Sequence, residues 1–442
     1  MIECQEFIKF DSNAPGDYAM NVYSSLEKPE EGFLIISCYF INVYLYKNEI
    51  NVYVRSGSLL ERVASELAFS LPSGKYKLNK FPVSEDFRSF ILGWCEGCYR
   101  SDDEKKHPTL IMWADKYDKE TIHLIESIQY AKRLIQLPAN LQTPTLLAEE
   151  CKTLCELLGL EFEIIKVNSA SKEFPLLASV GSGSGLPSYF FKAKYIGGDS
   201  DTKNVSLIGK GVVFDQGGAN AKSKDGIRNM KRDMSGAAIV LALLKYVHNL
   251  KLKINLFVNI PICLNSFGPN ALLPGDILMS ENGKTIEISN TDGEGRLIIA
   301  EAITKSSTYK SDLLITIGSL TSGARNFIGP DFSAAFSNPA SIAEELSKYS
   351  YSTGDPLISC PLWYLYKPFL KSSVADLVNS SEKLGMGSSM ICALFLHEFV
   401  GDDINWLHID APGWNFVSEF GVRTGPSAKG LSAIAHYLTT LD

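Results

Sequence analysis

Four acidic side chains are candidates for metal chemistry because each follows a strand-like run or lies among glycines. Asp215 ends the apolar run of GKGVVFDQGG, and Asp233 lies in MKRDMSGAA. Asp292 and Glu294 lie together in NTDGEGR. Four converging carboxylates would repel one another strongly unless cations were bound there. Together with a lysine amine they could hold two divalent ions, with some carboxylates bridging both.

The glycines beside Lys210 suggest a different possibility, a phosphate-binding loop. A P-loop needs Ser or Thr directly after its lysine, but Lys210 is followed by Gly211. GSGSG at 181–185 has neither a preceding lysine nor dinucleotide-binding spacing. Glycines on both sides of Lys210 instead allow a bulge that could bring Lys210 and Asp215 to one site. No histidine lies in these stretches, so an oxygen-dominated site suited to Mn²⁺, Mg²⁺ or Zn²⁺ is expected.

The spacing of Asp292 and Glu294 favours an extended backbone. Carboxylates two residues apart would diverge on a helix, whereas in an extended segment they lie on one side. The glycines beside Glu294 permit such an irregular backbone and can expose a main-chain carbonyl. Taken singly, each residue also has an ordinary interpretation: Asp215 could cap a turn, Asp233 could cap the helix that follows, and Lys222 could be a loop charge. Their joint occurrence favours the metal site.

Alternating strands and helices would position these residues. Buried strands are predicted in VSLIGKGVVF, INLFVNIPICL, DLLITIGSL and INWLHIDAPG. Helices are predicted in SGAAIVLALLKYVHNL, RLIIAEAITKS, SSMICALFLHEFV and AKGLSAIAHYL. This alternation predicts an α/β fold with a mostly parallel central sheet covered by helices on both faces. In such sheets the working residues collect at the carboxyl ends of the strands.

A smaller α/β domain is expected before this sheet, since the first part of the chain mixes short strand patterns with helical ones. SDDEKKH at 101–107 predicts a solvated loop, and a helix after it should stop near Pro138. A further helix should begin at Thr143, with a proline at its first position. We expect three parts: an N-terminal α/β domain over 1–120, a linker helix region over 121–142 and a catalytic domain over 143–442.

Composition bounds the class of protein. The 442 residues are 45% hydrophobic, which is enough for two or three domains. A net charge of -8 argues against nucleic acid as the main partner, and no apolar run approaches the roughly 18 residues of a membrane span. The opening MIECQEFIKFDSN lacks the apolar core of a secretory signal. Nine cysteines suit a reducing compartment, so a cytoplasmic location is expected.

Two cysteine pairs are too sparse for a structural zinc site. Cys95 and Cys98 are three residues apart, and Cys151 and Cys155 are one helical turn apart. A structural zinc ion needs four ligands, and neither pair has a second pair beside it. We therefore expect buried thiols that pack as small hydrophobic groups.

GKGVVFDQGG, MKRDMSGAA and NTDGEGRL resemble the signature segments of the leucyl aminopeptidase (cytosol aminopeptidase) family of two-metal exopeptidases. The likeness continues, in the family's order, from LIQLPANLQTP through PGDILMSENGKTIEIS, LTSGA, PLWYLY and VADLVNS to WLHIDAPGW. It implies an aminopeptidase that removes the N-terminal amino acid from peptides with a free N-terminus. It also implies a homohexamer with two divalent metal ions per subunit, Mn or Zn and possibly Mg.

The resemblance implies two overlapping sets of metal ligands. Lys210, Asp215, Asp233 and Glu294 would hold the more tightly bound ion. Asp215, Asp292 and Glu294 would hold the more exchangeable one, with Asp292 using its side chain and its backbone carbonyl.

The resemblance also implies the catalytic groups. A water molecule bridging the two ions would be the nucleophile. Lys222 would polarise the scissile carbonyl and stabilise the gem-diolate. Arg296 would hold a bicarbonate ion as general base, which is chemically sensible because no side chain in the motifs is an obvious base.

Several positions depart from the family's pattern without removing a metal or catalytic residue. Gln216 replaces a small hydroxyl residue, Gly293 an alanine, and Ser322 interrupts a tight LTGA turn. The loop around Trp414 differs from the commonest form of the segment that lines the pocket for the first side chain. Two alternatives stay open: a same-fold protein with a mainly DNA-binding or structural role, and a narrow dipeptidase such as a Cys-Gly hydrolase.

Overall fold

A computed structural model describes most of the chain. The described residues are 8–10, 18–23, 33–37, 41–46, 49–54, 60–73, 75–81, 87–98, 109–112, 119–199, 201–381 and 387–442. The chain divides into two compact units, Met1–Gln129 with Phe416–Thr424, and Tyr130–Asn415 with Gly425–Asp442. The loop predicted at 101–107 lies outside the described residues, and the domain boundaries predicted near 120 and 142 stay predictions.

The first unit is a small α/β structure. Its sheet has the order β1-β7-β6-β2-β5-β4-β3, in which β3, β4 and β5 pair antiparallel and the other neighbours pair parallel. The strands are β1 (Ile8–Phe10), β2 (Tyr18–Tyr23), β3 (Phe33–Ser37), β4 (Ile41–Tyr46), β5 (Glu49–Val54), β6 (Lys75–Lys80) and β7 (Thr109–Met112).

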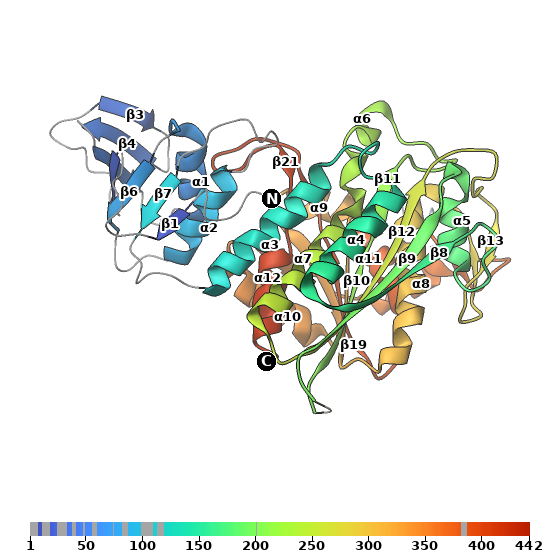
Figure 1. The fold of residues 1–442 in the computed structure, drawn as a ribbon. Coiled ribbons are helices and arrows are strands. Elements are labelled where there is room, and N and C mark those ends of the chain that lie inside the picture. Colours follow the sequence, from blue (N-terminus) through green and yellow to red (C-terminus); the bar gives the residue numbers. More distant parts are fainter. Residues whose placement is uncertain are drawn as a thin grey trace. The chain divides into compact units, whose positions relative to one another are not determined.

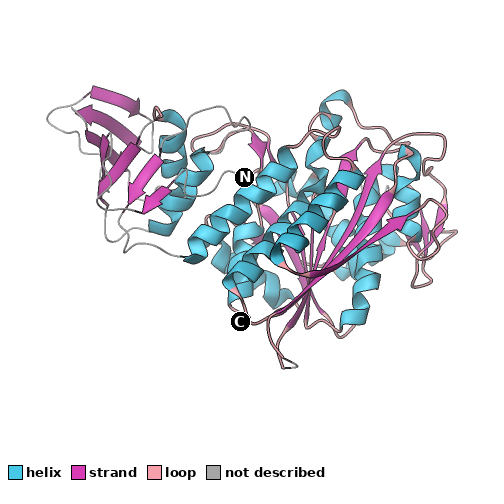
Figure 2. Ribbon diagram, in the orientation of Figure 1, coloured by secondary structure: helices cyan, strands magenta, loops and turns pink. Residues whose placement is uncertain are grey.

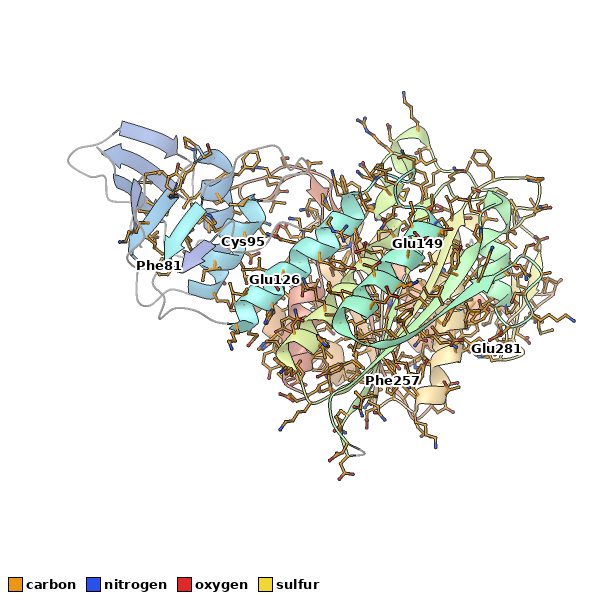
Figure 3. The ribbon with its side chains drawn as sticks, viewed as in Figure 1. Phe81, Cys95, Glu126, Glu149, Phe257 and Glu281 are labelled. Carbon is orange, nitrogen blue, oxygen red and sulfur yellow. The ribbon has the colours of Figure 1, made fainter. Side chains whose placement is uncertain are left out.

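Two helices of the first unit pack backbone to backbone. They are α1 (Leu60–Ser70) and α2 (Phe87–Cys98). A Cβ added at Gly93 of α2 would lie 1.9 Å from the carbonyl oxygen of Glu61 on α1, so only glycine permits this contact. Cys95 and Cys98 are buried on α2, as expected for thiols that pack as hydrophobic groups. Figure 3 labels Cys95 among the side chains of this unit.

The second unit is built on a larger, mostly parallel sheet. Its order is β17-β16-β19-β15-β10-β12-β9-β8, and β11 pairs with β12 off this path. The central neighbours β12, β10, β15 and β19 are parallel, whereas β8, β9 and the β16–β19 pair are antiparallel. The strands are β8 (Glu161–Val167), β9 (Ser188–Ile196), β10 (Asn204–Gly209), β11 (Gly211–Asp215), β12 (Asn255–Asn265), β15 (Leu313–Gly318), β16 (Ser333–Asn338), β17 (Leu357–Ser359) and β19 (Asn405–Asp410).

Helices cover both faces of this sheet, which confirms the predicted fold class (Figures 1 and 2). On one face α5, α8 and α11 share an apolar core with inward side chains of the strands. On the other face α7 packs on β10 and β15, with α4 and α12 beside it. The helices are α3 (Lys119–Gln136), α4 (Pro144–Leu158), α5 (Pro175–Gly181), α6 (Lys224–Ile227), α7 (Ser235–Leu250), α8 (Glu294–Ser306), α9 (Gly323–Ile328), α10 (Ala340–Ser350), α11 (Ser388–His397) and α12 (Leu431–Thr439).

Smaller elements border the sheet. A three-stranded sheet has the order β13-β14-β18, and β20 pairs with β21. None of the described helices combines the length and the apolarity that a membrane crossing requires. These smaller strands are β13 (Ile277–Met279), β14 (Thr285–Glu287), β18 (Leu377–Val378), β20 (Trp414–Asn415) and β21 (Gly425–Pro426).

Local signals account for several helix ends. Helix α3 ends at Gln136, two residues before Pro138, as predicted. Helix α4 begins at Pro144, and the side chain of its N-cap Thr143 accepts a hydrogen bond from the backbone N–H of Leu146. Both cysteines of this helix are buried, as the sequence suggested.

Candidate active site

A break in the sheet positions Lys210. The predicted strand VSLIGKGVVF is two strands, β10 and β11, separated by this one residue. The backbone N–H of Lys210 donates to Ile317 of β15 at 2.9 Å, and its carbonyl accepts from Ala237 of α7 at 2.9 Å. The predicted bulge around Lys210 is therefore a strand break, and a register shift in β11 follows between Val212 and Asp215. Lys210 is held by the centre of the sheet.

The ammonium group of Lys210 lies between two buried carboxylates. Its Nζ is 2.6 Å from Asp233 Oδ2 and 2.8 Å from Glu294 Oε1, and it donates to the carbonyl of Ser319 at 3.1 Å. We call Lys210, Asp233 and Glu294 the inner group; each side chain is at most 3% exposed. A Cβ at position 295 would lie 2.6 Å from Nζ, so Gly295 makes room for the amine.

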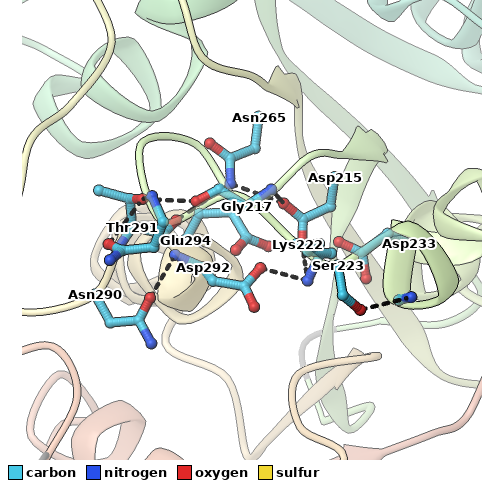
Figure 4. Close-up of polar contacts among 12 residues, drawn as sticks. Asp215, Gly217, Lys222, Ser223, Asp233, Asn265, Asn290, Thr291, Asp292 and Glu294 are labelled. Atoms are coloured by element: carbon cyan, nitrogen blue, oxygen red, sulfur yellow. Dashed lines mark hydrogen bonds and ion pairs between the residues drawn. The ribbon is translucent and has the colours of Figure 1, made fainter.

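Asp233 lies in the 3-10 turn η4 (Met230–Met234), and its Oδ2 contacts Lys210. Figure 4 shows its carboxylate turned toward the other carboxylates of the cluster. Its Oδ1 accepts a hydrogen bond from Ser319 Oγ at 2.7 Å. The ordinary interpretation, that Asp233 caps the following helix, is wrong, because the N-cap of α7 is Met234 and no side chain caps it. One oxygen of Asp233 is thus fixed by Ser319, and the other faces Lys210.

A second lysine joins two further carboxylates. Lys222 Nζ is 2.7 Å from Asp215 Oδ2 and also contacts Asp292 Oδ1 (Figure 4). We call Lys222, Asp215 and Asp292 the outer group. Asp215 ends β11, and its Oδ1 accepts from the N–H of Gly217 at 2.8 Å and from Asn265 Nδ2 at 2.8 Å. As in Asp233, one carboxylate oxygen of Asp215 is fixed by hydrogen bonds, and the other faces a lysine.

Asp292 and Glu294 do not lie on an extended segment, so that expectation is wrong. Asp292 lies in the 3-10 turn η5 (Thr291–Gly293), and Glu294 begins helix α8. The side chain of Asn290 causes the turn by accepting the N–H of Asp292 at 2.8 Å. The two carboxylates still converge, because oxygens of Asp215, Asp292 and Glu294 lie within 4.8 Å of one another.

The electrostatics of the cluster show an excess of buried negative charge. Burial and then the Asp215 carboxylate raise the pKa of Glu294 to about 8. Burial and then Asp233 raise the pKa of Asp215 to about 6. Burial opposes ionisation of Asp233 too, but Lys210 and Lys222 hold its pKa below the ordinary value. Burial would lower the pKa of Lys210, yet the neighbouring carboxylates raise it above its usual range.

This donor set fits divalent cations. Two ammonium groups face four carboxylates, so two negative charges lack a counter-charge in a desolvated place. Glu294 Oε2 is buried and has no hydrogen-bond partner among the described residues. Asp215 and Asp233 each keep one oxygen directed into the cluster. Hard oxygen ligands of this kind suit Mn²⁺, Mg²⁺ or Zn²⁺.

Arg296 lies near the cluster but takes no part in its ion pairs. Its side chain is on α8, is 6% exposed, and donates from Nη1 to the carbonyl of Asn379 at 2.6 Å. The Asn379 amide in turn donates to the carbonyl of Asn290 at 2.7 Å. Arg296 forms no ion pair with any described residue. A buried guanidinium without a carboxylate partner can receive an anion.

Sequence reasoning missed the residues that hold the ligands in place. Asn265 and Ser319 fix Asp215 and Asp233. Asp410, at the end of β19, accepts from the N–H of Leu320 at 2.9 Å and so holds the turn that carries Ser319. The only available signal was position, since each lies at or near the carboxyl end of a predicted strand.

Trp414, expected near the substrate pocket, is almost fully buried at 6% exposure. Lys231 Nζ lies 5.2 Å from the centre of its ring and donates to the carbonyl of Gln136 at 2.8 Å. Arg232 Nη1 donates to the carbonyl of Pro412 at 2.8 Å. The segment next to Asp233 therefore holds the Trp414 loop, and a role of Trp414 in specificity stays a prediction.

Known proteins resemble this chain in sequence and in fold. Residues 129–435 match the catalytic domain of the cytosol aminopeptidase family. A probable cytosol aminopeptidase from Aquifex aeolicus is 30% identical over 402 residues, which are 89% of this chain and 77% of that protein. The crystal structure of a cytosol aminopeptidase from Coxiella burnetii has a TM-score of 0.87 at 30% identity and covers 98% of both chains.

A further neighbour carries a metal ion. A bottromycin maturation enzyme in complex with Mn has a TM-score of 0.86 at 25% identity, over 96% of this chain and 99% of that chain. The family match includes every residue of the inner and outer groups. The chain therefore belongs to the cytosol aminopeptidase family and is an enzyme of the metallo-aminopeptidase class.

Proposed function

We propose that the chain removes the N-terminal amino acid from peptides at the inner and outer groups. The observation that carries this proposal is the convergence of four carboxylates and two lysines at the carboxyl edge of the sheet. Lys210, Asp215, Asp233 and Glu294 would hold one divalent ion, and Asp215, Asp292 and Glu294 a second. Bound ions would supply charge that acidifies a water molecule and polarises the substrate carbonyl.

Lys222 would act on the substrate itself. Its ammonium contacts two carboxylates, Asp215 and Asp292, that are proposed as ligands. Those carboxylates raise the pKa of Lys222 above its usual range despite its burial, so the side chain stays charged. A charged donor at this place would stabilise the negative charge that develops on the carbonyl oxygen of the scissile bond.

Arg296 would hold a bicarbonate ion that takes a proton during hydrolysis. Its burial and its lack of an ion pair among the described residues support an anion partner. Neither group offers a second candidate base, because the carboxylates and Lys210 are proposed as ligands and Lys222 is charged.

The proposal is tested by comparing leucine amide with acetyl-leucine amide, before chelation, after it, and after addition of Mn²⁺ or Zn²⁺. An enzyme of this kind orients its substrate by the free α-amino group, so only leucine amide should be hydrolysed. Activity should disappear on chelation and return with the ion. Full activity of the metal-free protein, or equal turnover of both amides, would contradict the proposal.

The same panel separates the alternatives. A narrow dipeptidase would hydrolyse Cys-Gly and leave longer peptides intact. A mainly DNA-binding protein would retard DNA in a gel at physiological salt and show no chelator-sensitive hydrolysis. A cytoplasmic location, which the relatives' names support, and a homohexamer, which the family resemblance implies, also stay proposals; cell fractionation and sedimentation would test them.

A further inference from the structure

The loop from Gln216 to Lys222, here named the Lys222 loop, is fastened to the segment that carries Asp292. The loop folds back on itself, since the N–H of Lys222 donates to the carbonyl of Gln216 at 3.0 Å. Gly217 has a φ of 89°, and a Cβ there would lie 2.4 Å from the carbonyl oxygen of Asn220. This tight fold directs Asn220 toward Thr291.

Asn220 and Thr291 form a reciprocal pair. The N–H of Asn220 donates to Thr291 Oγ1 at 2.8 Å, and the N–H of Thr291 donates to Asn220 Oδ1 at 2.8 Å. The Thr291 hydroxyl donates its own proton to the carbonyl of Gly217 at 2.6 Å. Thr291 is 1% exposed, whereas Asn220 lies at the surface, so the bonds are shielded from water on the Thr291 side. The hydroxyl thus ties both limbs of the loop to one residue (Figure 4).

We propose that Asn220 and Thr291 are positioning residues that set the place of the Lys222 ammonium relative to Asp292. Asn220 lies two residues before Lys222, and Thr291 directly precedes Asp292. The pair therefore joins the two backbone segments whose side chains meet in the outer group. The proposal rests on the catalytic role assigned to Lys222.

The carboxylates are held by bonds that involve neither Asn220 nor the Thr291 hydroxyl directly: Asp215 by Asn265 and the N–H of Gly217, and Asp292 by the cap of Asn290. Asn265 also donates to the backbone carbonyl of Thr291 at 3.2 Å, a bond that Thr291→Val keeps. Asn220 contacts no proposed metal ligand. Its loss should shift Lys222 while leaving the ligand oxygens in place. A misplacement of a reacting group by about 1 Å can cost up to roughly 100-fold in rate.

The experiment compares Asn220→Ala, Thr291→Val and Thr291→Ser in the metal-loaded enzyme, each also combined with Lys222→Ala. Metal content, kcat, KM and thermal unfolding are measured for all. Asn220→Ala and Thr291→Val should lower kcat by roughly 10- to 100-fold with both ions and KM retained. Thr291→Ser keeps the hydroxyl and should keep kcat near the wild-type value. In the Lys222→Ala background none of the three should lower kcat further.

Two results would overturn this inference. One is an equal loss of kcat from Asn220→Ala with and without Lys222, which would mean that Asn220 acts elsewhere. The other is a loss of bound ions in Thr291→Val, which would make the pair part of the metal site. If Lys222→Ala alone leaves kcat unchanged, the proposed function of Lys222 fails first, and that outcome is separately visible. Thr291→Val differs little in shape from wild type, so it serves if Asn220→Ala does not fold.

Discussion

The inner and outer groups contain the same chemistry in two different settings. Each pairs one lysine with two carboxylates, but the inner side chains are at most 3% exposed. In the outer group Lys222 is 14% exposed and Asp292 is 34% exposed. Lys210 lies at the break between β10 and β11, whereas Lys222 lies on a loop.

This difference agrees with the separate tasks proposed for the two lysines. A lysine that is fixed by the sheet, enclosed by carboxylates and only 3% exposed can serve as a ligand once it loses its proton. A lysine on a loop beside a partly exposed carboxylate can reach an incoming peptide. The inner group is therefore suited to tight metal binding and the outer group to exchange and catalysis.

The largest effect is expected for Lys222→Ala. Removing one donor that stabilises developing charge typically lowers the rate by roughly 10²–10³-fold. Because Lys222 is not proposed as a ligand, both ions and KM should be retained. Metal analysis beside kcat and KM tests this, with Lys210→Ala as the matched lysine variant that should lose metal. If Lys222→Ala loses metal while Lys210→Ala keeps it, the two lysines have been assigned in reverse.

Replacing one carboxylate at a time, first in one group and then in the other, should distinguish the two metal sites by the ion that each variant loses first. Asp292→Ala takes a ligand from the outer ion alone, so that ion should dissociate first while the inner ion remains. Asp233→Ala takes a ligand from the inner ion and leaves a buried lysine without one of its partners. Loss of a residue that merely supports a ligand typically weakens metal affinity by roughly 10–100-fold, so loss of a ligand should weaken it at least as much. Titration with a chelator while counting ions measures the order. Simultaneous loss of both ions from Asp292→Ala would argue against separable sites.

The residue types of the site could be predicted from the sequence, but its local geometry could not. The apolar run INLFVNIPICL predicted a buried strand, and this stretch forms β12. The helical spacing of apolar residues in SGAAIVLALLKYVHNL predicted a helix, and this stretch forms α7. The turn at Asp292 depends instead on one side chain, Asn290, which accepts a backbone N–H and overrides the spacing argument.

The residues that fix the proposed ligands could not be predicted from the sequence, for a related reason. Ser319 fixes Asp233 across 86 positions, and Asn265 fixes Asp215 across 50 positions. No periodicity or motif records such a pairing, because it exists only after the strands have aligned. Asn220 and Thr291 are 71 positions apart and were missed in the same way.

Metal binding to the inner group should depend on pH. The pKa of Lys210 lies above its usual range and that of Glu294 is about 8, so both carry protons that an ion must displace near neutral pH. Protons and ions compete, so the affinity falls as the pH falls, by roughly tenfold per pH unit for each proton released. Calorimetry in buffers of different ionisation enthalpy counts those protons. Lys210→Ala, with one of these protons already gone, should release fewer; equal release would rule out Lys210 as a ligand.

The smallest effect concerns a buried carboxylate outside both groups. Glu301 lies on α8, as Glu294 does, but accepts the backbone N–H groups of Leu176 and Leu177 at 2.9 and 2.8 Å and so caps α5. Glu301→Ala leaves two buried donors unpaired and should lower the free energy of unfolding by roughly 1–3 kcal/mol at pH 5, without changing kcat or bound metal.

Burial raises the pKa of Glu301 from 4.5 to about 7. The folded protein therefore holds this proton more tightly than the unfolded chain, and the contribution of Glu301 to stability is lost as the pH rises through about 7. The difference between wild type and Glu301→Ala should shrink from pH 5 to pH 8 in urea unfolding. A difference that grows over this range would show that the charged form is the stabilising one and that the two backbone donors compensate its burial.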